Sequence, residues 1–379
     1  MPNWKVQLFE LNFDEQEVEA VSRVIKSGWI TMGERIIEFE GRFANYLGHG
    51  SRAVAVSNGT AALHMSLLAL GITAGDEIIV PALTFVADIN VVRMVGATPV
   101  PADCTSLYDW NMSPADIEAK ITSRTKAVMI VHYAGYPCNM DEIVGICKRH
   151  GLYLVEDCAH APGAEYRGKK CGAFGDMSCF SFFTNKNLSV GEGGMYVTLS
   201  DALEQKGRYL RSHGMTTLTL DRHEGRAITY DVTQPGLNYR MDEMRAALGL
   251  VQLGKLAAAN AERERLTRHY IHLLSDVEGI TIPFVDYPNC KPSYHIFPIL
   301  LDKGIDRLSV INKLKEEGIQ SSIHYPSFHE FSAYKDFGLN DTPVATEISK
   351  RELTLPLFPT MGFEKVELVV KALKKALHQ

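Results

Sequence analysis

Apolar strand-like runs and helical stretches alternate through the first half of this 379-residue chain, and no other feature limits its fold more. The apolar runs cover residues 53–56, 77–81, 98–102, 127–132 and 152–156. This alternation predicts an α/β fold with a mostly parallel central sheet flanked by helices. Open sheets of this type bind ligands at the carboxyl ends of their strands, so residues that follow these runs are the first candidates for a site.

The second half of the chain predicts one more sheet strand, over residues 195–199, and then a smaller unit. A long helical stretch begins near residue 242. We therefore predict a large α/β domain over residues 13–241 and a small α+β domain over residues 242–379, with residues 1–12 packed back on the small domain. The strands and helices expected in the small domain cover residues 294–300, 319–324, 308–317 and 365–377.

The first helix of the chain has a recognisable start. Asn12 stands before a glutamate at capping-box spacing, which predicts that the helix begins after Asn12. Val18, Val21 and Ile25 recur at helical spacing and are expected to form its buried face. Gly28 is expected to end it.

Lys186 lies in a setting that is uncommon for a lysine. It follows Phe182 and Phe183 and precedes a glycine pair at residues 193–194. Burial beside apolar side chains disfavours the ammonium form, and the neutral amine can attack a carbonyl group. Because most lysines are solvated surface charges, this setting needs a second observation before it indicates function.

Asp157 provides that second observation. It ends the apolar run at 152–156 and should lie at the carboxyl end of a buried strand. Pyridoxal phosphate (PLP) needs an amine to hold its aldehyde and an acid to keep its pyridine nitrogen protonated. Lys186 and Asp157 fit these two roles, so the sequence predicts PLP as a cofactor.

The turn at Ser57-Asn58-Gly59-Thr60 joins the first predicted strand to the next helix. Free N–H groups at Gly59 and Thr60, the helix dipole and the Thr60 hydroxyl together favour a phosphate group. Many such turns carry these residue types only as helix caps, so the turn by itself is a weak indication.

Short motifs follow one another along nearly the whole chain. They are SGWITMG at 27–33, SNGTAALH at 57–64, GDEIIVP at 75–81, TFVA at 84–87, VEDCAHA at 155–161, FSF at 180–182, GEGG at 191–194, GLNYRM at 236–241 and LPLFP at 355–359. In this order, and with Lys186, they resemble the DegT-type PLP-dependent sugar aminotransferases of the aspartate aminotransferase-like group. So many matches in one order are highly specific, and the resemblance implies PLP-dependent transferase fold type I.

The resemblance implies roles for the residues around the cofactor ring. Lys186 would bind PLP as the internal aldimine and move the proton during amino transfer. Asp157 would pair with the pyridine nitrogen, and Phe85 would stack on the ring. His160, where many relatives carry glutamine, would lie near the oxygen substituent of the ring.

The resemblance also implies how the phosphate is held. Gly59 and Thr60 would bind it, Ser181 would add a hydroxyl group, and Asn238 would reach it from a neighbouring subunit. A homodimer with shared active sites is therefore expected.

Five residues are candidates for substrate binding. Trp29 and Thr31 would lie near the substrate by resemblance, although core packing explains Trp29 equally well. Arg240 is a candidate clamp for a diphosphate, with a surface ion pair as its alternative. His324 and Tyr325 are expected at a strand end beside the pocket, where a structural turn is an equal alternative.

The resemblance implies transfer of nitrogen from an amino acid, expected to be L-glutamate, through pyridoxamine phosphate to a keto sugar. The sugar is expected to be nucleotide-linked, with its keto group at carbon 4 or carbon 3. DCAHA, SGWIT and the VHYAG at 131–135 are similar to the aminotransferase that makes UDP-4-amino-4-deoxy-L-arabinose. TNKNLSV around Lys186 is similar instead to relatives that aminate other 4-keto hexoses, and lysine at 186 argues against the dehydratases of this fold, which carry histidine there.

Three alternatives remain open. A cyclitol ketone would serve as acceptor without a diphosphate pocket. A desulfurase would need a nucleophilic cysteine on a loop. A regulatory protein would keep the fold and have lost the activity, although the intact Lys186, Asp157, Gly59 and Thr60 argue against this.

Composition limits the partners. A net charge of −6 without a dense Lys/Arg block argues against nucleic acid and membrane surfaces. The seven cysteines contain no Cys-x-x-Cys pair and are expected to be reduced, and no signal peptide or membrane span is apparent, so we expect a cytoplasmic enzyme. His132, His213 and His329 are too far apart in sequence for a local metal motif, and no metal is expected.

Overall fold

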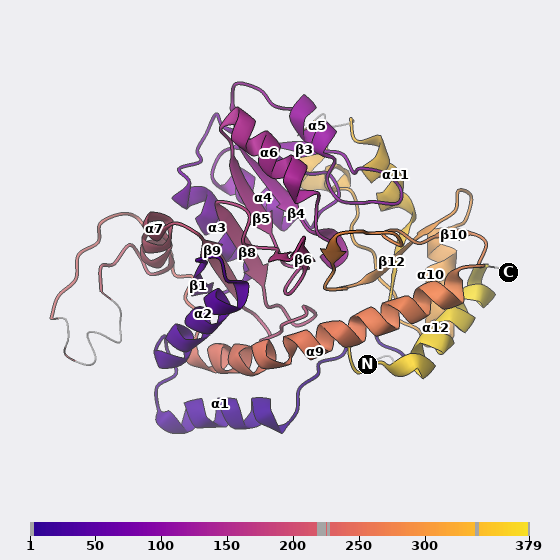
Figure 1. The fold of residues 1–379 in the computed structure, drawn as a ribbon, viewed down its shortest axis with the longest axis horizontal. Helices are drawn as coiled ribbons and strands as arrows, with labels where there is room; N and C mark the ends of the chain where they lie inside the picture. Colours follow the sequence, from indigo (N-terminus) through magenta and orange to yellow (C-terminus); the bar gives the residue numbers. More distant parts are fainter. Residues whose placement is uncertain (1–3, 218–224, 226–227, 338–340, 378–379) are drawn as a thin grey trace.

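The computed structural model describes residues 4–217, 225, 228–337 and 341–377, and its largest element is a seven-stranded sheet (Figure 1). Neighbouring strands pair in parallel except at β9, which is antiparallel to both of its neighbours. The other strands all point the same way, which confirms the predicted α/β fold with a mostly parallel sheet. In sheet order the strands are β1 (Arg52–Val56), β9 (Gly194–Thr198), β8 (Met177–Ser181), β5 (Tyr153–Asp157), β4 (Thr125–Val131), β2 (Glu77–Pro81) and β3 (Thr98–Ala102).

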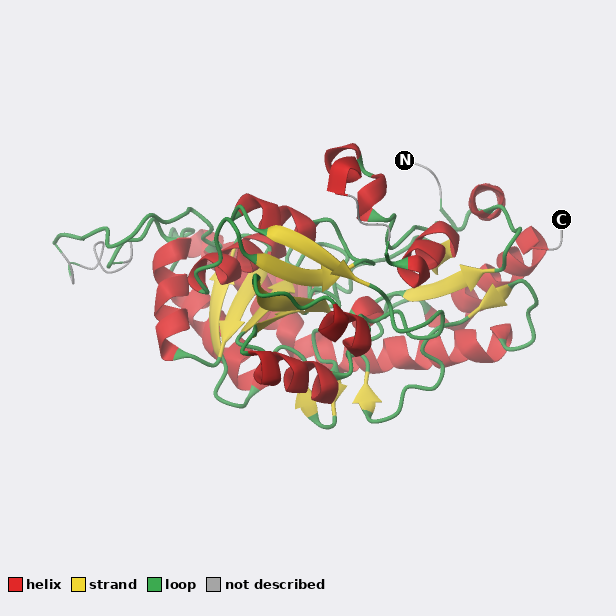
Figure 2. Ribbon diagram, turned by 90° about the horizontal axis from the view of Figure 1, so that it is seen from above, coloured by secondary structure: helices red, strands yellow, loops and turns green. Residues whose placement is uncertain are grey.

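Helices cover both faces of this sheet (Figures 1 and 2). Strand β1 shows why its sequence is apolar throughout: Val54 and Val56 pack in one buried cluster, and Ala53 and Ala55 pack in another on the opposite face. The helices around the sheet are α2 (Glu34–Leu47), α3 (Gly59–Ala69), α4 (Ala87–Met94), α5 (Pro114–Ala119), α6 (Met140–His150) and α7 (Asp201–Arg211), with a 3-10 turn η1 (Tyr133–Gly135).

A smaller antiparallel sheet and its helices form the second part of the structure. Its strands are β10 (Ile280–Thr281), β12 (Phe297–Leu301) and β13 (Glu352–Leu355), and its helices are α10 (Arg307–Glu316), α11 (Pro343–Arg351) and α12 (Gly362–Leu377). A third small sheet orders β11 (Cys290–Lys291), β6 (Glu165–Tyr166) and β7 (Lys169–Lys170), and two 3-10 helices are η2 (Phe328–Glu330) and η3 (Ser332–Phe337).

The strand expected over residues 319–324 does not form. The backbone there forms two isolated β-bridges, one between Val6 and Ile319 and one between Ser322 and Thr354. The Lys5 N–H also donates to the Gly318 carbonyl, so the start of the chain packs beside this segment.

Helix α9 (Glu243–Leu274) joins the two parts (Figure 1). Leu256 packs in the cluster under the large sheet, whereas Leu266 and Tyr270 pack in the cluster of the small sheet. The helix therefore contributes to both cores, and a domain boundary near residue 242 stays a prediction.

Helix α1 (Glu15–Ser27) differs from its prediction at its start and on its buried face. Asp14, not Asn12, caps it, and Asp14 forms a capping box with Glu17. Val18 and Ile25 are both 58% exposed, because the helix instead packs Ala20 and Val24 against α9. Its end at Gly28, which has a φ of 75°, is as predicted.

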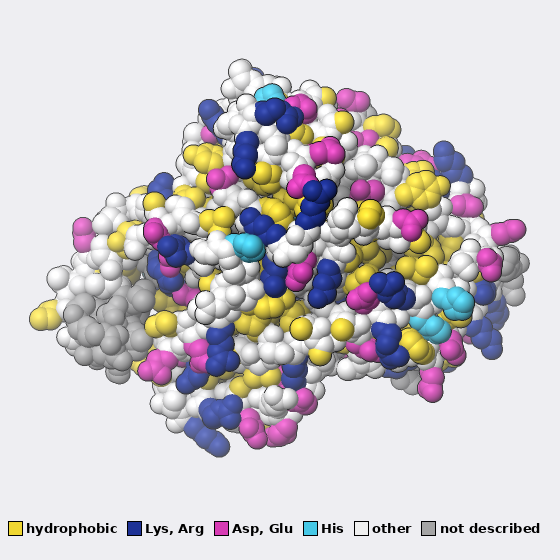
Figure 3. All heavy atoms as spheres, viewed as in Figure 1, with side chains coloured by type: hydrophobic (Ala, Val, Ile, Leu, Met, Phe, Trp, Pro, Cys, Tyr) yellow, Lys and Arg dark blue, Asp and Glu magenta, His cyan; other side chains and the backbone are white. Residues whose placement is uncertain are grey.

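Acidic and basic side chains are interspersed over the face of the molecule in Figure 3. Among the residues that the structure describes, none of the helices is both long enough and apolar enough to cross a membrane.

Glu243, the first residue of α9, links this helix to the start of α2. Its carboxylate is buried and accepts hydrogen bonds from the N–H groups of Gly33, Arg35 and Ile36, at 2.9, 2.9 and 3.0 Å. Helix α2 has no side-chain cap of its own at Gly33, so Glu243 takes that role from a distance of more than 200 residues in the sequence.

We expect Glu243→Ala to lower the free energy of unfolding by about 2–3 kcal/mol, because three N–H groups lose a charged acceptor. Glu19→Ala is the control, since Glu19 is exposed and forms a surface ion pair with Arg23. Urea unfolding of the two variants measures the difference. Equal stabilities would contradict the capping role of Glu243.

Candidate active site

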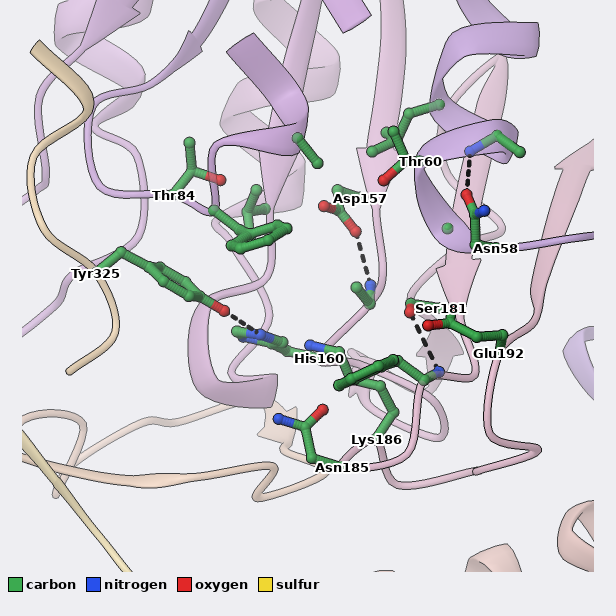
Figure 4. A pocket seen from close by; sticks show the side chains of 18 of the residues that line it. Asn58, Thr60, Thr84, Asp157, His160, Ser181, Asn185, Lys186, Glu192 and Tyr325 are labelled. Atoms are coloured by element: carbon green, nitrogen blue, oxygen red, sulfur yellow. Dashed lines mark hydrogen bonds between the residues drawn. The ribbon is translucent and has the colours of Figure 1, made fainter. Parts of the chain in front are cut away.

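A cavity of about 550 Å³ opens at the carboxyl edge of the large sheet (Figure 4). Its walls come from the ends of β4, β5 and β8, the start of α3, the loop that carries Lys186 and the segment at 324–325. Nine of the thirteen site residues that the sequence predicts line this cavity: Gly59, Thr60, Phe85, Asp157, His160, Ser181, Lys186, His324 and Tyr325.

The start of α3 forms one wall and has the character of a phosphate site. Asn58 caps the helix by accepting from the Ala61 N–H at 2.8 Å, and Gly59 and Thr60 are its first residues. A Cβ atom on Gly59 would lie 2.8 Å from the Ser181 Cβ, so only glycine lets the turn lie this close to the end of β8. The Ser181 hydroxyl and the N-terminus of α3 therefore face the same part of the cavity.

Asp157 ends β5 and is 8% exposed. One carboxylate oxygen accepts from the Ala159 N–H at 2.8 Å. Burial raises the pKa of Asp157, while the Ala159 hydrogen bond and the charge of Lys186 lower it. The charge of Asp157 therefore depends on its neighbours, which suits a carboxylate that pairs with a cation such as a pyridinium group.

Lys186 lies in the loop after β8 and is half-buried. Burial lowers the pKa of Lys186 to about 8, and the negative charge of Asp157 opposes this shift. The loop is anchored by Asn187, whose amide donates to Asn260 and to the Ser293 carbonyl at 2.9 and 2.8 Å. The structure therefore provides a fixed lysine whose neutral fraction near neutral pH, about a tenth at pH 7, is far larger than that of an ordinary lysine.

His160 and Tyr325 form a hydrogen-bonded pair across the cavity from the α3 turn (Figure 4). The Ala134 N–H donates to His160 Nδ1 at 3.2 Å, so in the neutral ring the proton is on Nε2. Burial lowers the pKa of His160 well below its usual value, which keeps the ring neutral. Nε2 then donates to the Tyr325 oxygen at 2.8 Å, and the hydroxyl proton of Tyr325 is left to donate elsewhere.

Phe85 is 55% exposed although it lies at the edge of a buried sheet. Its ring lies 5.7 Å from that of Tyr325, at an interplanar angle of 52°. An aromatic face open to a cavity is typical of a surface that stacks on a planar ligand. His324 contacts Thr354 through Nδ1 at 2.8 Å, and burial lowers its pKa to about 3.

Four predicted residues lie outside this cavity in the single chain. The backbone of Asn238 forms an isolated β-bridge with that of Ser212, and the backbone of Arg240 forms one with that of Val56. Trp29 lines a separate cavity between α1, α2 and α9, and Thr31 is exposed. Their assignment to the site stays a prediction.

Five polar or aromatic residues of the cavity were not singled out from the sequence: Asn58, Thr84, Asn185, Glu192 and Tyr239. Asn58 and Glu192 stand inside the SNGT and GEGG motifs and were open to recognition there. Tyr239 enters from a distant segment, and its hydroxyl contacts His64 Nδ1 at 3.1 Å. No local sequence pattern predicts the contact between Tyr239 and His64.

One group of potential metal ligands occurs among the described residues, at His132, Glu156 and Cys158. The Cys138 N–H donates to His132 Nδ1, so the other ring nitrogen carries a proton and donates to Glu156. Glu156 also accepts three backbone N–H groups and the hydroxyl of Ser178. These groups already satisfy one another, so the cluster is structural.

Comparisons with known proteins agree with this geometry. Residues 12–374 match the model of the DegT/DnrJ/EryC1/StrS aminotransferase family. The chain is 37% identical over 368 residues to the spore coat polysaccharide biosynthesis protein SpsC of Bacillus subtilis, covering 95% of this chain and 94% of SpsC. Among solved structures, DesV of S. venezuelae, in complex with a ketimine intermediate, is similar at 32% identity and a TM-score of 0.91 over 100% of both chains.

A sugar aminotransferase of Streptococcus pneumoniae described as putative, Spr1654 in its PLP form, is similar at 28% identity with a TM-score of 0.89, over 99% of this chain and 98% of Spr1654. The likeness covers the large sheet and the small part of the structure alike. The chain therefore belongs to the DegT/DnrJ/EryC1/StrS aminotransferase family.

Proposed function

We propose that the protein is a PLP-dependent aminotransferase that moves nitrogen from L-glutamate to a nucleotide-linked keto sugar with its keto group at carbon 4 or carbon 3. One observation carries the proposal: a half-buried lysine of lowered pKa, a buried carboxyl group and a helix N-terminus face one cavity of about 550 Å³. When bound, PLP supplies an aldehyde that receives the amino group and a ring that accepts an electron pair.

Each residue that lines the cavity would have a role set by its position. Lys186 Nζ would hold the cofactor and, when displaced, take up and return the proton of the reacting carbon. Asp157 would keep a proton on the ring nitrogen. Gly59, Thr60 and Ser181 would bind the phosphate at the start of α3.

The remaining wall would orient the ring and the acceptor. The exposed face of Phe85 would stack on the ring. Neutral His160 would hold Tyr325 so that its hydroxyl proton points to an acceptor in the cavity. His324 would contact the substrate from the same segment.

Membership of the family supports a sugar as acceptor, and the likeness to the UDP-4-amino-4-deoxy-L-arabinose enzyme remains a prediction from the motifs. A cyclitol ketone stays the alternative acceptor. Assay of a panel of keto nucleotide sugars and keto cyclitols, with L-glutamate as donor, separates the two.

The cysteines do not favour the desulfurase alternative. Burial raises the pKa of Cys158, Cys171 and Cys179 well above the usual value, and the pKa of the half-buried Cys290 is raised to about 11. A nucleophilic thiol needs the opposite shift. The seven free thiols accord with the expected cytoplasmic location.

We also propose a homodimer with shared sites. Asn238, Arg240, Trp29 and Thr31 lie outside the cavity of their own chain, as expected for residues that serve a partner. The described residues after α7 on either side of 218–227 extend away from the body (Figure 1), and among them Ile228 is 101% exposed. An extended segment with an exposed apolar side chain favours burial against a second subunit.

We expect Lys186→Ala to lose the visible absorbance of lysine-bound PLP and to lower amino transfer by roughly 10³-fold or more, because one amine both holds the cofactor and moves the proton. Spectra with PLP, before and after L-glutamate, measure both effects. Lys315→Ala on α10 is the control, since Lys315 is exposed. Wild-type turnover in Lys186→Ala would contradict the assignment.

PLP incorporation should depend on pH through Lys186. Only the neutral amine attacks the aldehyde, and with a pKa of about 8 the neutral fraction rises from about 1% at pH 6 to about half at pH 8. Stopped-flow absorbance should therefore show a rate that rises through pH 8 and then levels off. A rate that keeps rising to pH 10 would indicate an ordinary lysine pKa.

Shared sites predict complementation. Lys186→Ala and Asn238→Ala should each be impaired, and a mixture that exchanges subunits should regain about a quarter of the wild-type activity, because each mixed dimer holds one intact site. Activity of the mixture after exchange measures this. Failure to regain activity in proven mixed dimers would mean that each site takes both residues from the same chain.

A further inference from the structure

Asp88 is a fully buried carboxyl group in the first turn of α4, next to Ala87, which lines the cavity. The acids that often stabilise a helix start face solvent or accept its N–H groups. Asp88 is 0% exposed, and α4 has no side-chain cap. Helix stabilisation therefore does not explain its burial.

The two oxygens of Asp88 have different surroundings. Oδ2 accepts a hydrogen bond from the Thr84 hydroxyl at 2.5 Å. Oδ1 is buried, and none of the described residues provides a conventional donor to it. Asp157 is the acidic neighbour of Asp88, and the two carboxyl groups lie close enough for each to act on the pKa of the other.

Two neighbouring buried carboxyl groups cannot both be ionised at low cost, so one of the two is expected to keep its proton. Burial, followed by the charge of Asp157, raises the pKa of Asp88 well above its usual value. Asp157 has compensating partners, since the Ala159 N–H, Lys186 and His132 all favour its ionised form. Because Thr84 donates to Oδ2, the proton belongs on Oδ1 of Asp88.

We propose that Asp88 is a positioning residue that stays a neutral acid and donates a hydrogen bond from Oδ1 to Asp157, holding that carboxylate against the ring nitrogen of the cofactor. This inference rests on the proposed role of Asp157. The Ala159 N–H and the Asp88 acid then fix Asp157 from two directions, and the negative charge beside the ring is that of one carboxylate. Thr84 acts through Asp88 by fixing which oxygen carries the proton.

Two variants of Asp88 separate a neutral donor from a charged group. Asp88→Asn keeps a neutral donor of similar size, so PLP affinity and the pH midpoint of the bound-PLP absorbance should stay within about twofold and about 0.3 of a pH unit of wild type. Asp88→Leu keeps the shape without a donor, and its PLP affinity should fall roughly tenfold. Removal of an ionised Asp88 would instead shift the midpoint in Asp88→Asn by about one unit or more.

Infrared spectroscopy of the PLP-free protein tests the proton directly and does not need activity. A protonated-acid carbonyl stretch should be lost in Asp88→Asn, seen as the difference between the wild-type and variant spectra. The stretch of Glu352, whose pKa burial raises to about 8, should stay in both spectra. Asp103→Asn is the matched control, because Asp103 is a buried carboxylate outside the cavity that accepts three backbone N–H groups. Its replacement should leave the band in place.

Loss of the band and retention of PLP binding in Asp88→Asn support the proposal. A protonated-acid stretch that is the same in wild type and Asp88→Asn, a shifted midpoint, or wild-type PLP affinity in Asp88→Leu overturns it. If Asp88→Leu does not fold, the infrared result and Asp88→Asn still decide. Failure of the wild type to bind PLP through a lysine would overturn the proposed function instead, and the infrared band would still report on Asp88.

Discussion

The common direction of the sheet strands is the constraint on which the site depends. Because β1, β5 and β8 all run the same way, the turn at Gly59, the carboxyl group of Asp157 and the hydroxyl of Ser181 meet at one edge. Strand β9 runs in the opposite direction between β1 and β8, so that Gly194 lies beside the α3 turn. A Cβ atom there would lie 2.5 Å from the Asn58 carbonyl group, which explains the glycine.

Burial at this edge shifts a base and an acid in opposite directions. It lowers the pKa of Lys186 and raises that of Asp157, and each group partly offsets the shift of the other through its charge. The same low-polarity surroundings keep His160 neutral. A cationic ring with an anionic phosphate complements such a site, because it supplies a positive charge at Asp157 and a negative charge at the start of α3.

The sequence was sufficient for the parts of the site that follow directly from strand ends. Asp157 ends a strand, the α3 turn follows one, and Lys186 follows another, so local patterns placed all three. Thr84 and Tyr239 stand inside the TFVA and GLNYRM motifs, but their contacts in the site depend on packing, and no local pattern identified Asp88. Helix α1 was misread for a related reason: Glu17 is buried because it pairs with Lys255 and Gln252 on α9, a polar contact that hydrophobic spacing does not reveal.

The central claim is that Lys186 is the residue that holds the cofactor, and chemical trapping tests it most directly. The protein is loaded with PLP, the bond between PLP and protein is reduced with borohydride, and the labelled peptide is identified by mass spectrometry. The label should be on Lys186. A label on another lysine, or none on a protein that still transaminates, would contradict the account.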